Sequence, residues 1–283
     1  MPGVESGGTR EGYVVVNGVR TYYEERGSGE PLLFLHGGLC TAEMCQPQTV
    51  ALAAQYRVLV PERRGHGRTP DVPGPLSYEM MARDTTAFMD ALGISTAHLV
   101  GWSDGALVGL LVAMGDPERV RRLVFMGQAL NLDGLRPGTV EYMSGLTARA
   151  IPAYTEAYER LSPDGPGHFA VVLDKLKRLW CAPTGVTLDR LAGVRSPTLI
   201  LIGDNDIVDV AHAAAMYQAL PEGRLGVVPN GSHHLPMERP DVVNQFMLAF
   251  LSEDEPAPVT PPRVRQRTHA SDGAVRTVGD GTP

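Results

Sequence analysis

Residues 101–105 read Gly-Trp-Ser-Asp-Gly and lie between two segments of different character. The apolar run at residues 97–100 is typical of a buried strand, and the apolar run at residues 106–111 is typical of a helix. Glycine at both ends allows the strained backbone of a sharp turn, where a bulkier residue would collide with the turn. A strand, a sharp turn and a helix with a serine at the apex predict that Ser103 is a catalytic nucleophile.

A serine hydroxyl is a poor nucleophile at neutral pH and needs an adjacent base, which an acidic side chain must orient. His233 follows the strand-like run at residues 224–228, and Asp206 follows the one at residues 198–202. Taken singly, His233 also fits a surface histidine and Asp206 a turn residue. The chain order Ser103, Asp206, His233 is the one associated with this turn motif. We therefore predict that His233 takes the proton of Ser103 and that Asp206 orients and stabilises the imidazolium.

Two backbone donors are predicted for the oxyanion of acyl transfer. One is the N–H of Asp104, at the start of a helix whose dipole also favours negative charge. The other is the N–H of Gly38, because Gly37 and Gly38 follow the strand that ends at His36 and let the backbone approach the substrate closely. His36 itself, like His66, is expected to hydrogen-bond backbone around the site.

Trp102 and Asp104 are the candidate substrate-binding residues, and the carboxylate of Asp104 leaves two interpretations open. In the first, it packs beside the turn and hydrogen-bonds nearby backbone without touching the substrate. In the second, it selects substrates that carry a cationic amine, such as aminoacyl esters or macrolides with an amino sugar.

Apolar runs of strand length alternate with helical patterns over most of the chain, which predicts a mainly parallel sheet with helices on both faces. Asn17-Gly18 is a two-residue hairpin signal, so the sheet is expected to open antiparallel. Eight strands are expected, at residues 13–16, 21–25, 32–36, 57–61, 97–102, 120–126, 198–202 and 224–228. Further helices are expected at residues 48–54, 78–92, 210–220 and 241–251.

The alternation is interrupted at residues 131–194, where prolines separate several short helical patterns. An insertion of this size is expected to form a small helical cap over the carboxyl edge of the sheet, so that residues 12–130 and 195–252 form the core. Residues 253–283 contain many prolines, charges and small residues and are expected to form a disordered tail. Residues 1–11 are expected to be a flexible amino terminus.

Composition excludes several classes of function. A net charge of −7 argues against a nucleic-acid partner. No apolar run is long enough to span a membrane, and residues 1–9 show no secretory signal, so we expect a cytoplasmic protein. Three cysteines fit a reduced compartment. No residues have metal-ligand spacing, and Gly65-His66-Gly67 lacks the dinucleotide fingerprint, so neither a metal nor a cofactor is expected.

Five motifs carry a resemblance to a known family and extend over residues 12–251. They are Leu35-His36-Gly37-Gly38, Arg64-Gly65-His66-Gly67-Arg68-Thr69, Gly101-Trp102-Ser103-Asp104-Gly105, Gly203-Asp204-Asn205-Asp206, and Gly231-Ser232-His233 with Glu238-Arg239-Pro240. Together they resemble the α/β-hydrolase fold superfamily. Within it, the serine motif and the short helical cap resemble the biphenyl-hydrolase-like, or valacyclovir-hydrolase-like, esterases.

The resemblance implies a choice between neighbouring candidates. It implies Asp206 rather than Asp204 or Asp209, because the acid falls three residues after the glycine that ends the strand. It implies His233 rather than His234 by the distance to the Glu-Arg-Pro motif at residues 238–240. The chain departs from the pattern at Glu62, where relatives often have aspartate, and we expect this to change loop packing and not chemistry.

Two classes of function are compatible with these residues. The first is a cofactor-free serine hydrolase, monomeric or homodimeric, that cleaves a carboxylic ester of a small molecule, including a lactone, a macrolide ester or an activated amide, through an acyl group on Ser103. The second is a non-hydrolytic protein of the same fold: a lyase, an isomerase, a cofactor-free oxygenase or a binding protein. Ser103 argues against epoxide hydrolases and haloalkane dehalogenases, which carry aspartate at this position.

Overall fold

The first two strands form the hairpin that Asn17-Gly18 predicts. Both turn residues have positive φ, 47° and 82°, as a two-residue turn of type I′ requires. The first strand begins three residues earlier than predicted, because Arg10 pairs with Glu25 across the ladder and through an ion pair of 2.5 Å. Cross-strand pairing, and not the strand propensity of residues 10–12, sets this end.

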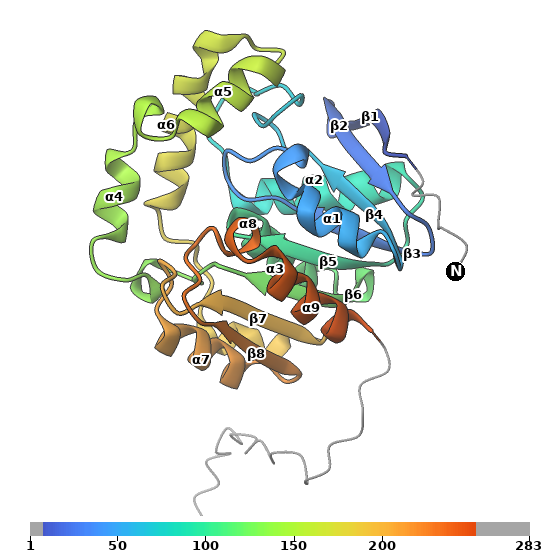
Figure 1. The fold of residues 1–283 in the computed structure, drawn as a ribbon, viewed down its shortest axis with the longest axis vertical. Helices are drawn as coiled ribbons and strands as arrows, with labels where there is room; N and C mark the ends of the chain where they lie inside the picture. Colours follow the sequence, from blue (N-terminus) through green and yellow to red (C-terminus); the bar gives the residue numbers. More distant parts are fainter. Residues whose placement is uncertain (1–7, 253–283) are drawn as a thin grey trace, which may run out of the picture. The chain divides into compact units, whose positions relative to one another are not determined.

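A computed structural model describes residues 8–252, and eight strands within them form one sheet (Figure 1). The strands are β1 (Arg10–Val16), β2 (Val19–Arg26), β3 (Glu30–Leu35), β4 (Tyr56–Pro61), β5 (Ala97–Trp102), β6 (Val120–Met126), β7 (Thr198–Gly203) and β8 (Gly223–Val228). Their order is β1-β2-β4-β3-β5-β6-β7-β8; β2 is antiparallel to both of its neighbours, and the other pairs are parallel. The mainly parallel eight-stranded sheet is confirmed. The tail predicted at residues 253–283, and most of the flexible amino terminus, lie outside the described residues.

Helices cover both faces of this sheet, as predicted. In the described part of the chain the helices are α1 (Gln46–Leu52), α2 (Tyr78–Ala91), α3 (Asp104–Gly115), α4 (Thr139–Gly145), α5 (Pro152–Leu161), α6 (Phe169–Trp180), α7 (Val210–Ala219), α8 (Leu235–Glu238) and α9 (Pro240–Leu251). One buried cluster joins the sheet to α2, α3 and α7, and a second joins it to α1 and α9. Burial of these apolar faces removes them from water and is the main contribution to stability.

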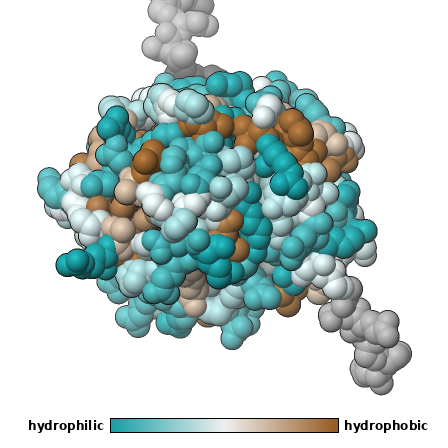
Figure 2. Space-filling model, turned by 90° about the horizontal axis from the view of Figure 1, so that it is seen from above, coloured by the Kyte–Doolittle hydropathy of each residue, from teal (hydrophilic) through white to brown (hydrophobic). Residues whose placement is uncertain are grey.

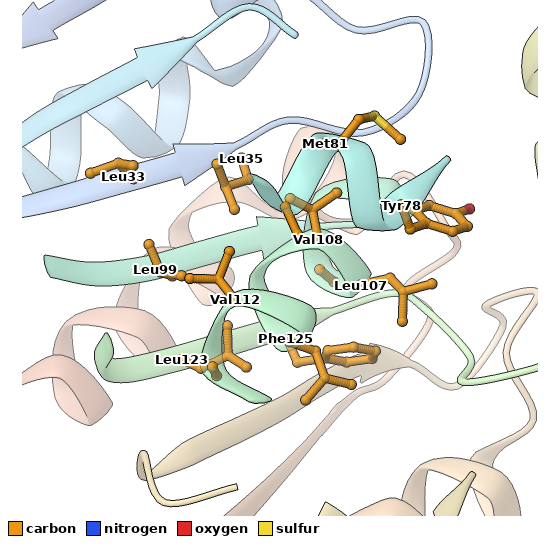
Figure 3. Packing of buried hydrophobic residues seen from close by; sticks show 14 of the residues in the cluster. Leu33, Leu35, Tyr78, Met81, Leu99, Leu107, Val108, Val112, Leu123 and Phe125 are labelled. Carbon is orange, nitrogen blue, oxygen red and sulfur yellow. The ribbon is translucent and has the colours of Figure 1, made fainter. Parts of the chain in front are cut away.

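The helix after Ser103 is the most deeply buried of the central helices. α3 is apolar on every side and contacts β3, β5, β6 and α2. Figure 3 shows its side chains among those of the strands and α2: Leu107, Val108 and Val112 lie near Leu35, Met81, Leu99, Leu123 and Phe125. This packing holds the amino terminus of α3, and therefore Ser103, rigidly against the sheet.

The segment between β6 and β7 forms the short helices that the sequence predicts. α4, α5 and α6 occupy it with 3-10 turns between them, and Figure 1 shows these three helices on the left of the view, to one side of the strands. α6 buries an apolar stripe that includes Val172 and Leu176.

Glu62, the departure from the family pattern, lies at the end of β4 and is fully buried. It accepts hydrogen bonds from the N–H of Ala42 at 3.0 Å and from the N–H and guanidinium of Arg68 at 2.5 and 2.9 Å. The carboxylate therefore joins two loops, in agreement with a role in loop packing.

No helix in residues 8–252 is long and apolar enough to cross a membrane. On the face shown in Figure 2, hydrophobic residues form small groups among hydrophilic ones. Scattered exposure of this kind is ordinary for a globular surface.

Candidate active site

Ser103 lies at the apex of a strained turn between β5 and α3. Its φ of 54° and ψ of −123° are outside the regions that side-chain-bearing residues ordinarily adopt. A Cβ on Gly101 would lie 2.3 Å from the carbonyl oxygen of Gly105, so this glycine avoids a clash within the turn. A Cβ on Gly105 would lie 1.9 Å from the carbonyl oxygen of Leu35. The second collision is therefore with the end of β3, and not with the turn as we expected.

The structure brings Ser103, His233 and Asp206 together in one hydrogen-bonded chain. Nε2 of His233 lies 3.0 Å from Oγ of Ser103, and Nδ1 of His233 lies 2.9 Å from Oδ1 of Asp206. Asp206 is 1% exposed, so its carboxylate can accept a hydrogen bond from Nδ1–H in a desolvated setting, an arrangement in which Nε2 is able to accept the hydroxyl proton. The alternative Asp209 instead caps α7, where it accepts a hydrogen bond from the N–H of Ala211 at 2.6 Å.

These three side chains come from the carboxyl ends of parallel strands. Ser103 follows β5, Asp206 follows β7 and His233 follows β8, so the strand order places all three at one edge of the sheet. Loops at this edge are where open α/β sheets bind ligands.

His234 lies beside His233 but has a different hydrogen-bond partner. Its Nε2 is 2.9 Å from the hydroxyl of Tyr154 on α5. Burial lowers the pKa of this imidazole, and the neighbouring His233 lowers it further. The structure thus places His233, and not its neighbour, against Ser103, and it ties α5 to the loop that carries both histidines.

The two predicted oxyanion donors flank Ser103 and are available. Residues 37–40 form a turn in which the N–H of Cys40 donates to the carbonyl of Gly37 at 3.3 Å, with Leu39 at φ 62°. Within residues 8–252, no hydrogen bond uses the N–H of Gly38 or of Asp104. Their freedom is what an oxyanion hole requires.

The side chain of Asp104 is held by two aromatic residues that sequence reasoning missed. Its carboxylate accepts a hydrogen bond from the hydroxyl of Tyr78 at 2.8 Å, and its two oxygens lie 3.0 and 2.9 Å from Nε1 of Trp180. The expected bonds to nearby backbone are therefore wrong, because α2 and α6 bring side-chain donors instead. The carboxylate and burial both raise the pKa of Tyr78, with burial the larger cause. No local signal linked these positions, which are 26 and 76 residues away from Asp104.

The polar end of the Trp102 side chain binds the protein itself and is not available for a polar contact with a substrate. It is 3% exposed and donates from Nε1 to the carbonyl of His233 at 3.0 Å. The indole therefore holds the loop that carries His233, and only its ring is left to face the cavity.

A cavity of about 360 Å³ lies above Ser103. Its outer wall comes from the segment between β6 and β7, through Tyr142, Met143, Leu146, Ile151 and Tyr154. The lining also includes Tyr78, Trp102 and Trp180, whose polar ends are all hydrogen-bonded within the protein. Around Ser103 the cavity therefore presents mainly ring faces and aliphatic chains.

The remaining titratable groups near the cavity have no catalytic geometry. Cys40 lines the cavity, but burial raises the pKa of its thiol to about 12. His36 bonds the carbonyl of Gly37 at 2.7 Å and the N–H of Arg63 at 3.1 Å, and Nδ1 of His66 bonds the carbonyl of Arg64 at 3.0 Å. Both histidines hydrogen-bond backbone, as the sequence analysis expects. No group of three or more metal-ligating side chains occurs in residues 8–252.

The chain is similar in sequence and fold to several known proteins. The serine hydrolase BPHL of Homo sapiens is 28% identical over 258 residues, covering 84% of this chain and 85% of BPHL, which confirms the resemblance expected from the serine motif. RutD of Azorhizobium caulinodans, which bears the name of a carbamate hydrolase, is 29% identical over 254 residues, covering 82% of this chain and 95% of RutD. The crystal structure of carboxylesterase CesB from Bacillus subtilis superposes with a TM-score of 0.71 at 25% identity, covering 86% of this chain and 92% of CesB.

The family assignment rests on most of the chain. The sequence profile described as the alpha/beta hydrolase family matches residues 32–246, a range that runs from within β3 to within α9 and includes all three residues of the hydrogen-bonded chain. The chain therefore belongs to the alpha/beta hydrolase family.

Proposed function

We propose that this protein is a serine hydrolase that cleaves a carboxylic ester of a small molecule through an acyl group on Ser103. The observation that carries the proposal is the chain Ser103–His233–Asp206, with hydrogen-bond distances of 3.0 and 2.9 Å. The similarity to proteins named as serine hydrolase and carboxylesterase supports it.

The geometry supports a two-step reaction. Oγ of Ser103 attacks the ester carbonyl while its proton passes to Nε2 of His233, and the N–H groups of Gly38 and Asp104 bind the resulting oxyanion. Collapse of the tetrahedral intermediate breaks the ester bond, and His233 returns the proton to the leaving alcohol. Water, deprotonated by His233, then attacks the acyl carbon; collapse of this second intermediate breaks the bond to Oγ of Ser103, His233 returns its proton to Oγ, and the acid is released.

The lining of the cavity favours an uncharged, apolar acyl group. A volume of about 360 Å³ accommodates an aryl or branched aliphatic group, and Tyr78, Trp102 and Trp180 keep their polar ends hydrogen-bonded within the protein, so these three rings offer apolar faces to it. Carbamates are a second candidate substrate class, because RutD bears the name of a carbamate hydrolase. Ser103 would attack a carbamate carbonyl in the same way as an ester carbonyl.

Fluorophosphonate labelling tests the nucleophile. Oγ of Ser103 attacks phosphorus, fluoride leaves and His233 takes the proton, so mass spectrometry is expected to find one adduct, on Ser103. Iodoacetamide is the matched control: it is expected to leave activity intact, because the buried thiol of Cys40 stays protonated. A folded protein without an adduct on Ser103 contradicts the proposal.

A substrate panel then separates the classes within the proposal. We expect 4-nitrophenyl esters of benzoic and branched aliphatic acids to be cleaved faster than the matching aryl carbamates and than esters of charged acids. Preference for the carbamate supports the second class, and turnover of none of them excludes both.

Asp104→Asn tests whether the carboxylate selects cationic substrates. Its oxygens are engaged by Tyr78 and Trp180 and it is 1% exposed, so we expect kcat/KM to fall by the same factor for an α-amino ester and for its N-acetylated counterpart. The melting temperature is expected to fall too, because removing one member of a buried set of charges costs roughly 3 kcal/mol.

The paired substrates make this prediction decisive. They share the leaving group and the acyl skeleton and differ only in charge. A loss of tenfold or more that is restricted to the amine-bearing ester, equivalent to about 1.4 kcal/mol, assigns Asp104 to substrate recognition instead.

A further inference from the structure

Arg63 is a buried cation directly behind the predicted oxyanion hole. It lies two residues after β4 and is 5% exposed. Its Nη1 donates to the carbonyl of His36 and its Nη2 to the carbonyl of Gly37 at 3.2 Å. Its backbone N–H donates to Nε2 of His36 at 3.1 Å. Arg63 therefore holds the segment that leads from β3 into the oxyanion turn at three points.

The contact of the Arg63 guanidinium with the carbonyl of Gly37 bears on the direction of the Gly38 N–H. The carbonyl of Gly37 receives Nη2 of Arg63, Nδ1 of His36 at 2.7 Å and the N–H of Cys40 at 3.3 Å. In a planar trans peptide, this carbonyl and the N–H of Gly38 point in opposite directions. Donors that hold the Gly37 oxygen on one side therefore direct the Gly38 N–H to the other side.

The positive charge of Arg63 lies near a negative charge that would oppose the oxyanion, the carboxylate of Asp104. The carboxylate of Asp104 lies so close to the oxyanion turn that a Cβ on Gly38 would be 2.5 Å from its Oδ2. A negative charge there opposes a developing oxyanion. Burial lowers the pKa of the Arg63 guanidinium, and the Asp104 carboxylate is the largest influence that opposes this shift. The two buried charges thus act on each other across the oxyanion turn.

We propose that Arg63 is a positioning residue of the oxyanion hole, whose guanidinium aims the Gly38 N–H by holding the Gly37 carbonyl and offsets the charge of Asp104. The inference rests on the proposed function, since it concerns the oxyanion of the same reaction. It assigns to Arg63 a share of transition-state stabilisation without contact to the substrate.

Arg63→Met removes the donors and the charge but keeps an unbranched apolar chain. We expect kcat to fall about 10- to 100-fold with KM within about twofold, because the lost interaction matters mainly when the oxyanion forms. The inhibition constant of an aryl trifluoromethyl ketone is expected to rise by the same factor. Its carbonyl accepts Oγ of Ser103 and becomes a tetrahedral oxyanion, with the proton on His233.

Arg64→Met is the matched control. Arg64 is the next residue and is also largely buried, but its guanidinium pairs with Asp84 on α2 at 2.6 and 2.8 Å. This variant is expected to lose stability and keep kcat and the ketone affinity. An equal loss of kcat in both variants, or an unchanged kcat in Arg63→Met, overturns the proposal.

Two further variants separate geometry from charge, and the first of them remains informative if Arg63→Met does not fold. Arg63→Lys keeps the charge and loses the planar fork, so we expect an intermediate kcat; a wild-type kcat contradicts the positioning role. In Arg63→Met/Asp104→Asn both charges are gone, and we expect kcat to be higher than in Arg63→Met. If the fold-loss of kcat in the double variant equals the product of the losses in Arg63→Met and Asp104→Asn, the charge compensation is contradicted.

The rate of fluorophosphonate labelling distinguishes this proposal from the proposed function. It reports on Ser103 and its oxyanion donors without any ester substrate. Slow labelling of Arg63→Met, in a protein that cleaves no ester, supports the inference and refutes the ester hydrolase. Normal labelling and normal ester turnover in Arg63→Met refute the inference alone.

Discussion

Replacing Ser103 by alanine is expected to lower kcat for ester cleavage by a factor on the order of 10⁶, as loss of a triad nucleophile does. The reason is that Oγ of Ser103 is the atom that Nε2 of His233 contacts at 3.0 Å, so the variant loses the one hydroxyl that this imidazole is placed to deprotonate. The measurement is the steady-state rate with the best ester of the panel, with loss of fluorophosphonate labelling as a second readout.

The matched control is structural. Ser103→Ala removes one oxygen and keeps the Cβ at the strained φ of 54°, so the circular dichroism spectrum is expected to be unchanged and the melting temperature nearly so. Ester turnover near the wild-type rate in this folded variant would show that the reaction does not use Ser103.

Replacing His233 by alanine is the second change with a very large expected effect, on the order of 10⁴- to 10⁶-fold in kcat. Without the imidazole, nothing accepts the Ser103 proton or returns it to the leaving alcohol, and Asp206 loses the group that it orients at 2.9 Å.

His234→Ala is the control for the position of the base. It removes the bond to Tyr154, whose length is 2.9 Å, together with the edge contact of the imidazole with the Trp102 ring, and a neutral hydrogen bond contributes about 1 kcal/mol. We therefore expect less than about a tenfold loss of kcat/KM, and Tyr154→Phe is expected to reproduce it. An inactive His234→Ala beside an active His233→Ala would move the base by one residue.

Much of this site is predictable because its signals are local. Gly101 and Gly105 indicate a turn that requires small residues, and strand-like runs precede Ser103, Asp206 and His233. The carboxyl ends of parallel strands meet at one edge of a sheet, so chain order alone predicts that these three side chains converge. The hydrogen-bonded chain in the structure follows from that rule.

The differences arise where distant segments meet. β1 begins at Arg10 because of its partner Glu25. The clash that requires glycine at residue 105 is with Leu35 of β3. Neither partner is adjacent in sequence, so no periodicity or turn signal reports it.

By itself, the sequence determined the mainly parallel sheet, the serine turn and the order of the acid and base, because each depends on short-range steric limits and on strand polarity. Only the tertiary structure decided what surrounds them. In the fold, Tyr78 and Trp180 donate hydrogen bonds to the Asp104 carboxylate. The Arg63 guanidinium donates to the carbonyl of Gly37 in the oxyanion turn. The physical reason is that a buried charge must find its donors and counter-charges in whatever the packing brings within about 3–4 Å, and that neighbourhood is a property of the fold and not of any local stretch of chain.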